Sequence, residues 1–393
     1  MRSPGLPAAG LIILAVCFAV ATLMPFSARA TPYWGPAEIE GKRMVQQEQI
    51  VPWPSSIRHD FFESRSPLEG KIGYLEMFGR IAEFLSIWQV HDPGDPAFGG
   101  MREGEHLPDI IQTDNTSESI WVWSRYRELT GDDQYHQNIL DAFTYSMNYP
   151  AYLEEGTSSP VSGYYRMYNC GWATRAELKY RQVYGDDTYK DYGDSCASYI
   201  RYHTLDRPSY WFYRYVNPPV LSWALGNLYF AGIHGANVEW MEEAVRQARE
   251  RVKVWVEEEP ELLGNETWAM SGGATMWGLL SSFFSAHPES ADAWVPLYKD
   301  WMDVFSDPGE FQNAWNGWYA LGHWATGTAL DDPYHLDLHI MLADTLIAED
   351  GDGDGGIPAR PEDSDDMDQT WVSNYLAFMG LHPLLAPAAA LPP

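Results

Sequence analysis

A segment rich in small and aromatic residues recurs six times along this chain, at intervals of about 50 residues. The copies begin near Ser117, Trp172, Ser222, Gly273, Gly317 and Trp371. Each copy contains Ala, Gly, Ser, Trp and Leu with little charge, which indicates a helix that is buried on all sides. A fixed period of this kind is typical of folds built from one repeated supersecondary unit.

Amphipathic helical patterns lie between the buried segments and alternate with them. They cover residues 70–88, 133–147, 188–202, 238–256, 291–304 and 333–346. Near-identical turns, Gly-Asp-Asp at 131–133 and at 185–187, join two of the buried segments to the amphipathic segments that follow. We expect the glycine of each turn to end one helix and an aspartate to cap the next.

The two ends of this series each lack a partner. The amphipathic pattern at 70–88 has no buried segment before it, and the buried segment at Trp371 has no amphipathic helix after it. If these two pack together, six helical hairpins close on themselves, whereas an open solenoid would need polar caps. We therefore predict an all-α fold, an (α/α)6 toroid over residues 67–382. An extended arm at 31–66 would precede it and a flexible tail at 383–393 would follow.

The first 30 residues have the pattern of an export signal. Arg2 precedes an uncharged apolar run at 11–24, and Ala28-Arg29-Ala30 supplies the small residues of a cleavage site. The run is short for a membrane anchor, which needs about 20 apolar residues. We expect cleavage after Ala30 and a secreted or periplasmic protein.

In such a compartment Cys170 and Cys196, on neighbouring predicted helices, favour one disulfide, with two buried thiols as the alternative.

The charge balance restricts the partners. The formal net charge is −30, from 55 acidic and 25 basic residues. A nucleic acid needs basic patches on the protein that binds it, and an anionic membrane repels a strongly acidic surface. We therefore expect neither a nucleic acid nor a membrane partner, and a monomer.

Long loops lead into the predicted buried helices, and these loops would gather on one face of a closed ring. Long loops in a compact domain are usually functional. Here they carry aromatic rings, amides, carboxylates and arginines, the groups that stack on sugar rings and bind sugar hydroxyls. The candidate substrate-binding residues are Asn169, Trp172, Tyr213, Arg214, Asn217, Trp268, Trp315 and Trp318. The alternative is that these aromatic side chains only wedge the loops together.

This arrangement resembles the six-hairpin (α/α)6 superfamily of glycoside hydrolases and polysaccharide lyases. The resemblance spans roughly residues 70–381 and depends on the repeat architecture, not on a family-defining motif. It implies a secreted enzyme that degrades a glycan, with its site at the N-terminal ends of the inner helices. Such an enzyme would bind a glycan as substrate.

Two mechanisms fit the candidate catalytic residues. A hydrolase needs two carboxyl groups, for which Asp114 is the first candidate, with helix capping as its alternative role. Glu118 lies one turn further on, and the possible partner acids are Glu103, Glu105, Glu266, Asp366 and Asp368. A lyase needs a base and a group that offsets a carboxylate, which Tyr165 and Arg166 could supply.

An aspartate-rich segment in the sixth loop predicts a Ca²⁺ site. Asp350, Asp352 and Asp354 alternate with glycines, and Gly356-Ile357 follows, as in the first half of an EF-hand loop. Pro361 stands where an EF-hand has its bidentate glutamate, and Glu362 comes one residue late. We predict a structural Ca²⁺ loop that is not an EF-hand, with a solvated acidic turn as the alternative.

Two other functions remain open on the sequence alone. A toroid with the aromatic lining but without a catalytic carboxyl pair would bind glycans without cleaving them. The run Asp363-Ser364-Asp365-Asp366 also fits the DxDD proton-donor pattern of class II terpene cyclases, which use the same helical toroid. An acidic run produces this match by chance, and a terpene pocket would bury the acid in an apolar cavity.

Overall fold

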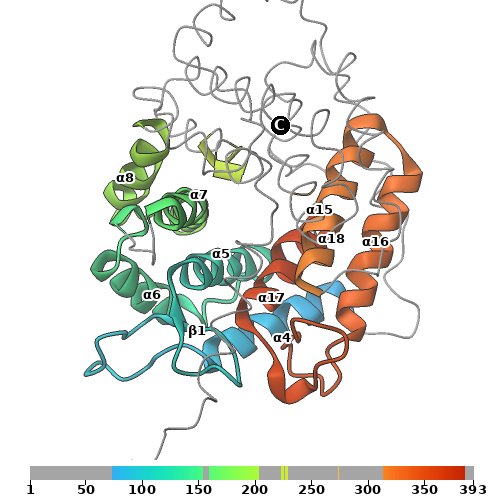
Figure 1. Cartoon of the computed structure of the whole chain (residues 1–393), viewed down its shortest axis with the longest axis horizontal. Coiled ribbons are helices and arrows are strands. Elements are labelled where there is room, and N and C mark those ends of the chain that lie inside the picture. The colour runs from blue at the N-terminus through green and yellow to red at the C-terminus, as the bar shows by residue number, and fades with distance from the viewer. Residues whose placement is uncertain are drawn as a thin grey trace, which may run out of the picture. The chain divides into compact units, whose positions relative to one another are not determined.

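A computed structural model describes residues 73–153, 159–202, 223–224, 226–228, 273 and 313–385 (Figure 1). Helices dominate these residues. The α-helices are α4 (Tyr74–Ile87), α5 (Thr113–Thr130), α6 (His136–Asn148), α7 (Ser159–Tyr184), α8 (Lys190–Arg201), α15 (Asn313–Leu330), α16 (Pro333–Ala348), α17 (Thr370–Tyr375) and α18 (His382–Leu385). Short 3-10 helices cover Ala151–Leu153 (η1) and Asp365–Met367 (η5), and a π-helix covers Leu376–Leu381 (η6). Two strands of two residues each, β1 (Met101–Arg102) and β2 (Ile111–Gln112), pair antiparallel.

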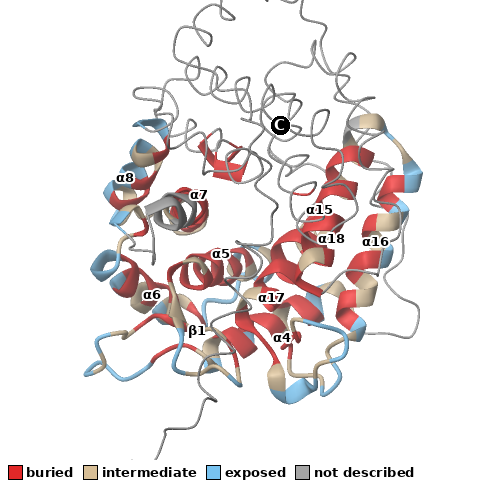
Figure 2. Ribbon diagram, viewed as in Figure 1, coloured by how far each residue is buried: buried red, intermediate tan, exposed pale blue. Residues whose placement is uncertain are grey.

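Buried and amphipathic helices alternate as the sequence predicted. Helix α5 packs against α6, α7 against α8, and α15 against α16, so each pair forms a hairpin. Helices α5 and α15 are buried along most of their length, whereas α6, α8 and α16 carry exposed residues on one side (Figure 2). The predicted buried segments at 222 and 273 are helical at the positions described, 223–224, 226–228 and 273.

The turns between the helices differ from the prediction in one detail. Gly131 and Gly185 have positive φ values of 76° and 67°, and the preceding helices α5 and α7 end at these glycines as expected. The aspartates that follow do not cap α6 and α8, whose N-cap residues are tyrosines without side-chain caps. Instead Asp132 Oδ1 accepts the N–H of Gln134 at 3.0 Å, which shapes the turn.

The first and last described helices pack together, as the closed arrangement requires. Helix α4 contacts α17, η6 and α18. The indole N–H of Trp123 in α5 donates to the carbonyl of Ala82 in α4 at 2.9 Å, within the core. Helix α18 extends to Leu385, three residues past the predicted end of the domain. The leading segment, the arm and the outer helices predicted at 238–256 and 291–304 lie outside the described residues.

The predicted disulfide is corrected. Cys170 in α7 and Cys196 in α8 are both buried, but no disulfide joins them. Both thiols lie close to Tyr192, and burial, followed by the charges of Cys196 and Cys170, raises the pKa of the Tyr192 hydroxyl well above its usual range. The structure therefore has two buried thiols, which was the alternative to the predicted bond.

Within the described ranges, no helix is both long enough and apolar enough to span a bilayer.

Candidate active site

The first and sixth loops meet at the N-terminal ends of α5 and α17. The backbone N–H of Glu105 donates to the carbonyl of Asp368 at 3.0 Å, and the N–H of Thr370 donates to the carbonyl of Glu103 at 2.9 Å. Gly104 lies against this junction, where an added Cβ would come within 2.3 Å of the Asp368 carbonyl oxygen. These bonds bring together two loops that are more than 250 residues apart in the sequence.

Asp114 lies in the first turn of α5 and is partly buried. It does not cap the helix, because the N-cap residue is Gln112; its Oδ1 accepts the N–H of the adjacent Asn115 at 3.0 Å. Burial raises the pKa of Asp114 to about 6, backbone N–H groups oppose the rise, and the charge of Glu103 adds to it. The carboxyl group therefore changes its protonation state close to neutral pH.

Glu118 lies one helical turn deeper and is only 1% exposed. Neither of its carboxyl oxygens forms a hydrogen bond with a described residue. Burial, then the charge of Asp114, raises the pKa of Glu118 well above its usual range. Burial in this position therefore favours the protonated form of Glu118.

Glu103 completes the group of predicted acids. It follows β1 directly, is partly buried, and its Oε2 accepts the side-chain N–H of Gln112 at 2.8 Å. Gln112 ends β2 and precedes α5, so one hydrogen bond fixes Glu103 beside the turn that carries Asp114. The structure thus places Asp114 near both Glu118 and Glu103.

A pair of tyrosines lies next to these acids and was not predicted as part of the site. The hydroxyl oxygens of Tyr168 in α7 and Tyr375 in α17 are 2.6 Å apart, and both side chains are buried. Burial raises the pKa of each hydroxyl, and the charges of Glu118 and Asp114 raise both further. The neighbouring Asn374 was missed as well. Asn374 and Tyr375 follow Trp371 in α17. Their place at the start of a predicted inner helix is the feature of the sequence that could have indicated them.

Two predicted substrate-binding tryptophans belong instead to the core. Trp172 and Trp318 have no exposed surface. The ring of Trp223 lies between them, 4.5 Å from Trp172 and 5.2 Å from Trp318, measured between ring centroids. The expectation that these two rings offer a stacking surface to a sugar is therefore corrected. Trp315, near the start of α15, is only partly buried.

The candidate lyase residues are not in a loop. Helix α7 begins at Ser159, so Tyr165, Arg166 and Asn169 all lie within it. Asn169 is buried, and the charge of Arg166 acts on the Tyr199 hydroxyl of the outer helix α8. The side chain of Tyr165 is outside the described set, as are the candidate residues Tyr213, Arg214, Asn217 and Trp268.

The predicted aspartates of the sixth loop do gather. One carboxylate oxygen from each of Asp350, Asp352 and Asp354 lies within 4.8 Å of the other two. Glu362 is exposed and is not in this group, so its predicted place as a ligand is corrected. Asp368 lies closer. Burial and then the charges of Asp354 and Glu105 raise its pKa to about 8.

The remaining acids of the loop do not form a terpene-cyclase site. Asp365 and Asp366 are exposed in the short helix η5, and Asp363 is only partly buried. A proton donor of that class needs an acid held in an apolar cavity, and these carboxylates are in contact with water.

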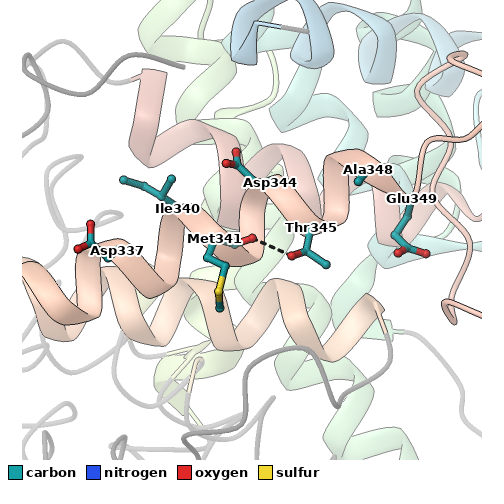
Figure 3. Close-up of a pocket in the computed structure, with 7 residues that line it drawn as sticks. All are labelled: Asp337, Ile340, Met341, Asp344, Thr345, Ala348 and Glu349. Atoms are coloured by element: carbon teal, nitrogen blue, oxygen red, sulfur yellow. Dashed lines mark hydrogen bonds between the residues drawn. The ribbon is translucent and has the colours of Figure 1, made fainter. Parts of the chain in front are cut away.

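A surface depression of about 430 Å³ lies elsewhere, on one side of the outer helix α16 (Figure 3). Its lining comes from one helix: Asp337, Ile340, Met341, Asp344, Thr345, Ala348 and Glu349. Asp344 accepts a hydrogen bond from the hydroxyl of Tyr74 in α4 at 3.0 Å. Among the described residues that line it none is aromatic, whereas sugar sites usually offer an aromatic ring for stacking.

Comparison with known proteins gives the fold. No family model and no curated protein matches this chain. Among solved structures it is similar to the GH76A α-1,6-mannanase of Salegentibacter sp. HEL1_6, with a TM-score of 0.56 and 13% identity over 80% of this chain and 99% of that one. An inactive variant of that enzyme, with two consecutive aspartates replaced by asparagine, was solved with α-1,6-mannotriose and matches with a TM-score of 0.55. A variant with both replaced by alanine was solved with α-1,6-mannotetrose and gives 0.54. These enzymes are six-hairpin toroids, and this chain has the same all-α (α/α)6 fold.

Proposed function

We propose that this protein is a glycoside hydrolase in which Asp114 and Glu103 are the catalytic carboxyl pair. The observation that carries the proposal is the position of Asp114. Its carboxyl group lies at the N-terminal end of an inner helix. Its pKa is raised to about 6, and the negative charge of Glu103 contributes to that rise. A glycosidase needs two carboxyl groups whose environments give them different proton affinities.

The exposure of the three acids supports a different role for each. A catalytic carboxyl group must touch the substrate, and Glu118 is only 1% exposed, whereas Asp114 and Glu103 are both partly exposed. Asp114, which holds its proton to higher pH than an ordinary aspartate, acts as the general acid on the leaving oxygen. Glu103 is the partner carboxylate. Glu118, which is buried one helical turn beyond Asp114 in α5, is a positioning residue.

The substrate is a neutral glycan, and an α-1,6-linked mannan is the first to test. The similar solved enzymes are α-1,6-mannanases, two of them with bound mannose oligosaccharides. A net charge of −30 disfavours polyanionic substrates. Export, which the first 30 residues predict, would bring the enzyme to such polymers.

The test uses the protein without its first 30 residues on α-1,6-mannan and on neutral and uronic-acid polysaccharides. Reducing ends and the absorbance of an unsaturated uronate are followed together. We expect reducing ends without the absorbance. Asp114→Asn and Glu103→Gln should each lower kcat/KM by at least about 100-fold. Asp109→Asn, which changes an exposed acid of the same loop, should stay within about twofold.

The pH profile supplies a second readout. Because a general acid must be protonated, kcat/KM should fall as the pH rises above about 6, the pKa of Asp114. Circular dichroism confirms that each variant is folded. Full activity of folded Asp114→Asn would overturn the assignment. Unsaturated products would make the protein a lyase, and glycan binding without cleavage would make it a binding toroid.

A further inference from the structure

Three aspartates of the sixth loop present their carboxylates to a common point. One oxygen from each of Asp350, Asp352 and Asp354 lies within 4.8 Å of the others. Gly353 and Gly355, with φ values of 84° and 98°, allow the backbone to turn between them. Hard divalent cations such as Ca²⁺ take several oxygen ligands at 2.3–2.6 Å, and oxygens that share one ion lie at separations of this order. An acidic cluster alone does not establish a site, so a second observation is needed.

Asp368 supplies that observation. Its side chain is 1% exposed, and its Oδ1 has no hydrogen-bond partner among the described residues. The carboxylate lies against Gly356, where an added Cβ would be 2.2 Å from Asp368 Oδ2. The N–H of Gly356 in turn donates to Asp354 Oδ1 at 2.7 Å. Asp368 therefore lies beside Asp354 at Gly356, next to the aspartate cluster, and a buried carboxylate oxygen without a partner is costly unless a cation binds it.

The basic side chains in the described part of the chain do not neutralise the carboxylates of this cluster. Arg80 in α4 is the one basic residue of the described ranges with an ion pair to the group, at 3.8 Å from Asp350 Oδ2. The same guanidinium also pairs with Glu76 at 3.0 Å. One shared arginine faces the four aspartates and Glu105, whose charges act on one another. Like charges this close destabilise the loop unless a multivalent cation joins them.

The cluster also joins the two loops that build the candidate active site. Glu105 of the first loop donates its backbone N–H to the carbonyl of Asp368. Two residues later Thr370 donates to the carbonyl of Glu103 and begins α17. An ion held by Asp368 would thus fix the first loop, including Glu103, to the start of α17.

We propose that Asp350, Asp352, Asp354 and Asp368 bind one Ca²⁺ ion, with Glu105 at its edge, and that this ion fastens the first loop to the sixth. The site differs from an EF-hand. The fourth carboxylate comes from Asp368 rather than from Glu362, and Glu105 of the neighbouring first loop lies beside it. The ion is structural and does not contact the substrate.

The test measures Ca²⁺ binding directly, without an activity assay. The protein without its first 30 residues is treated with a chelator, and Ca²⁺ is then titrated by calorimetry while thermal unfolding is followed. We expect binding of one ion per chain and a higher Tm with Ca²⁺ than with the same concentration of Mg²⁺, which prefers a tighter octahedral site. Asp354→Asn and Asp368→Asn should each weaken Ca²⁺ binding by at least about tenfold.

Glu362→Gln is the matched control, because it removes an exposed acid of the same loop that lies outside the cluster. Its affinity for Ca²⁺ should stay within about twofold of the parent. If Asp368→Asn does not fold, terbium luminescence of the parent protein, displaced by Ca²⁺, still tests for the ion. The absence of both binding heat and a Tm shift in the parent would overturn the site. A loss in Glu362→Gln equal to that in Asp368→Asn would overturn the ligand set.

Discussion

At the level of single residues, two acids on one face of α5 show how burial changes the pKa of a carboxyl group. Asp114 and Glu118 are one helical turn apart, so their side chains lie near each other. The side chain of Asp114 is partly exposed and accepts hydrogen bonds from two backbone N–H groups, which limit the rise of its pKa. Glu118 is almost fully buried and has no hydrogen bond among the described residues. Burial raises the pKa of both carboxyl groups.

Glu118 should make the protein less stable as the pH increases. Its ordinary pKa is 4.5 and its folded pKa is well above that, so the folded state binds more protons than the unfolded state between these two values. The free energy of unfolding therefore falls with rising pH in this window, by up to about 1.4 kcal/mol per unit, and is independent of this group below pH 4.5.

Glu118→Gln should remove this part of the pH dependence. Urea unfolding of the parent and the variant at a series of pH values measures it. The comparison variant is Asp114→Asn, which should change the slope only below about pH 6, because the folded pKa of Asp114 is about 6. Parallel profiles for the parent and Glu118→Gln above pH 6 would show that Glu118 is ionised in the folded protein.

At the element scale, the loops depend on glycines that serve different purposes. Gly99 in the first loop has a φ of 85°, and its N–H donates to the carbonyl of Val90 at 2.9 Å. An added Cβ at Gly99 would lie 1.9 Å from the carbonyl oxygen of Asp141 in α6. Gly131 has a similar φ of 76°, but an added Cβ would meet nothing within 4 Å. Of these two glycines, Gly99 is the one needed both for its backbone conformation and for close packing.

Gly99→Ala and Gly131→Ala separate these two requirements. Each alanine has to adopt the left-handed conformation, at a cost of about 1–2 kcal/mol. Gly99→Ala must in addition push apart the first loop and α6, which costs about 1–3 kcal/mol more. Urea unfolding measures both losses. Equal losses in the two variants would mean that the first loop can move away from α6 at no cost.

At the scale of the whole molecule, one aromatic ring connects inner helices that are far apart in the sequence. Phe378, in the π-helix η6, has its ring centroid 4.6 Å from Trp121 in α5 and 4.9 Å from Trp172 in α7. Trp223 packs on the same ring at 5.8 Å. All four side chains are almost fully buried. The last inner helix therefore closes the fold by packing on the first two rather than by local interactions.

Phe378→Ala should lower the free energy of unfolding by about 3–5 kcal/mol, because the cavity would open between three helices that cannot all collapse into it. Leu75→Ala is the control. Leu75 lies in α4 at the same closure but is 44% exposed, so its loss should cost no more than about 0.5 kcal/mol. A small effect of Phe378→Ala on the denaturation midpoint would show that closure does not depend on this aromatic cluster.

Features that depend on local pattern could be predicted from the amino-acid sequence. The spacing of small and aromatic segments predicted the alternation of buried and amphipathic helices, and Gly131 and Gly185 predicted where α5 and α7 end. The alternating aspartates predicted that Asp350, Asp352 and Asp354 would gather. Each of these depends on residues a few positions apart, whose geometry is set by the backbone of one helix or turn.

The tertiary structure alone decided which side chains face one another across the fold. A tryptophan at a helix start looks the same in the sequence whether it stacks on a sugar or, like Trp172, packs on Phe378. The contact between Tyr168 and Tyr375 and the burial of Asp368 beside Gly356 join segments that no local pattern relates. Burial and the pKa shifts that follow from it depend on the summed packing of several helices, so they are properties of the folded chain and not of any segment within it.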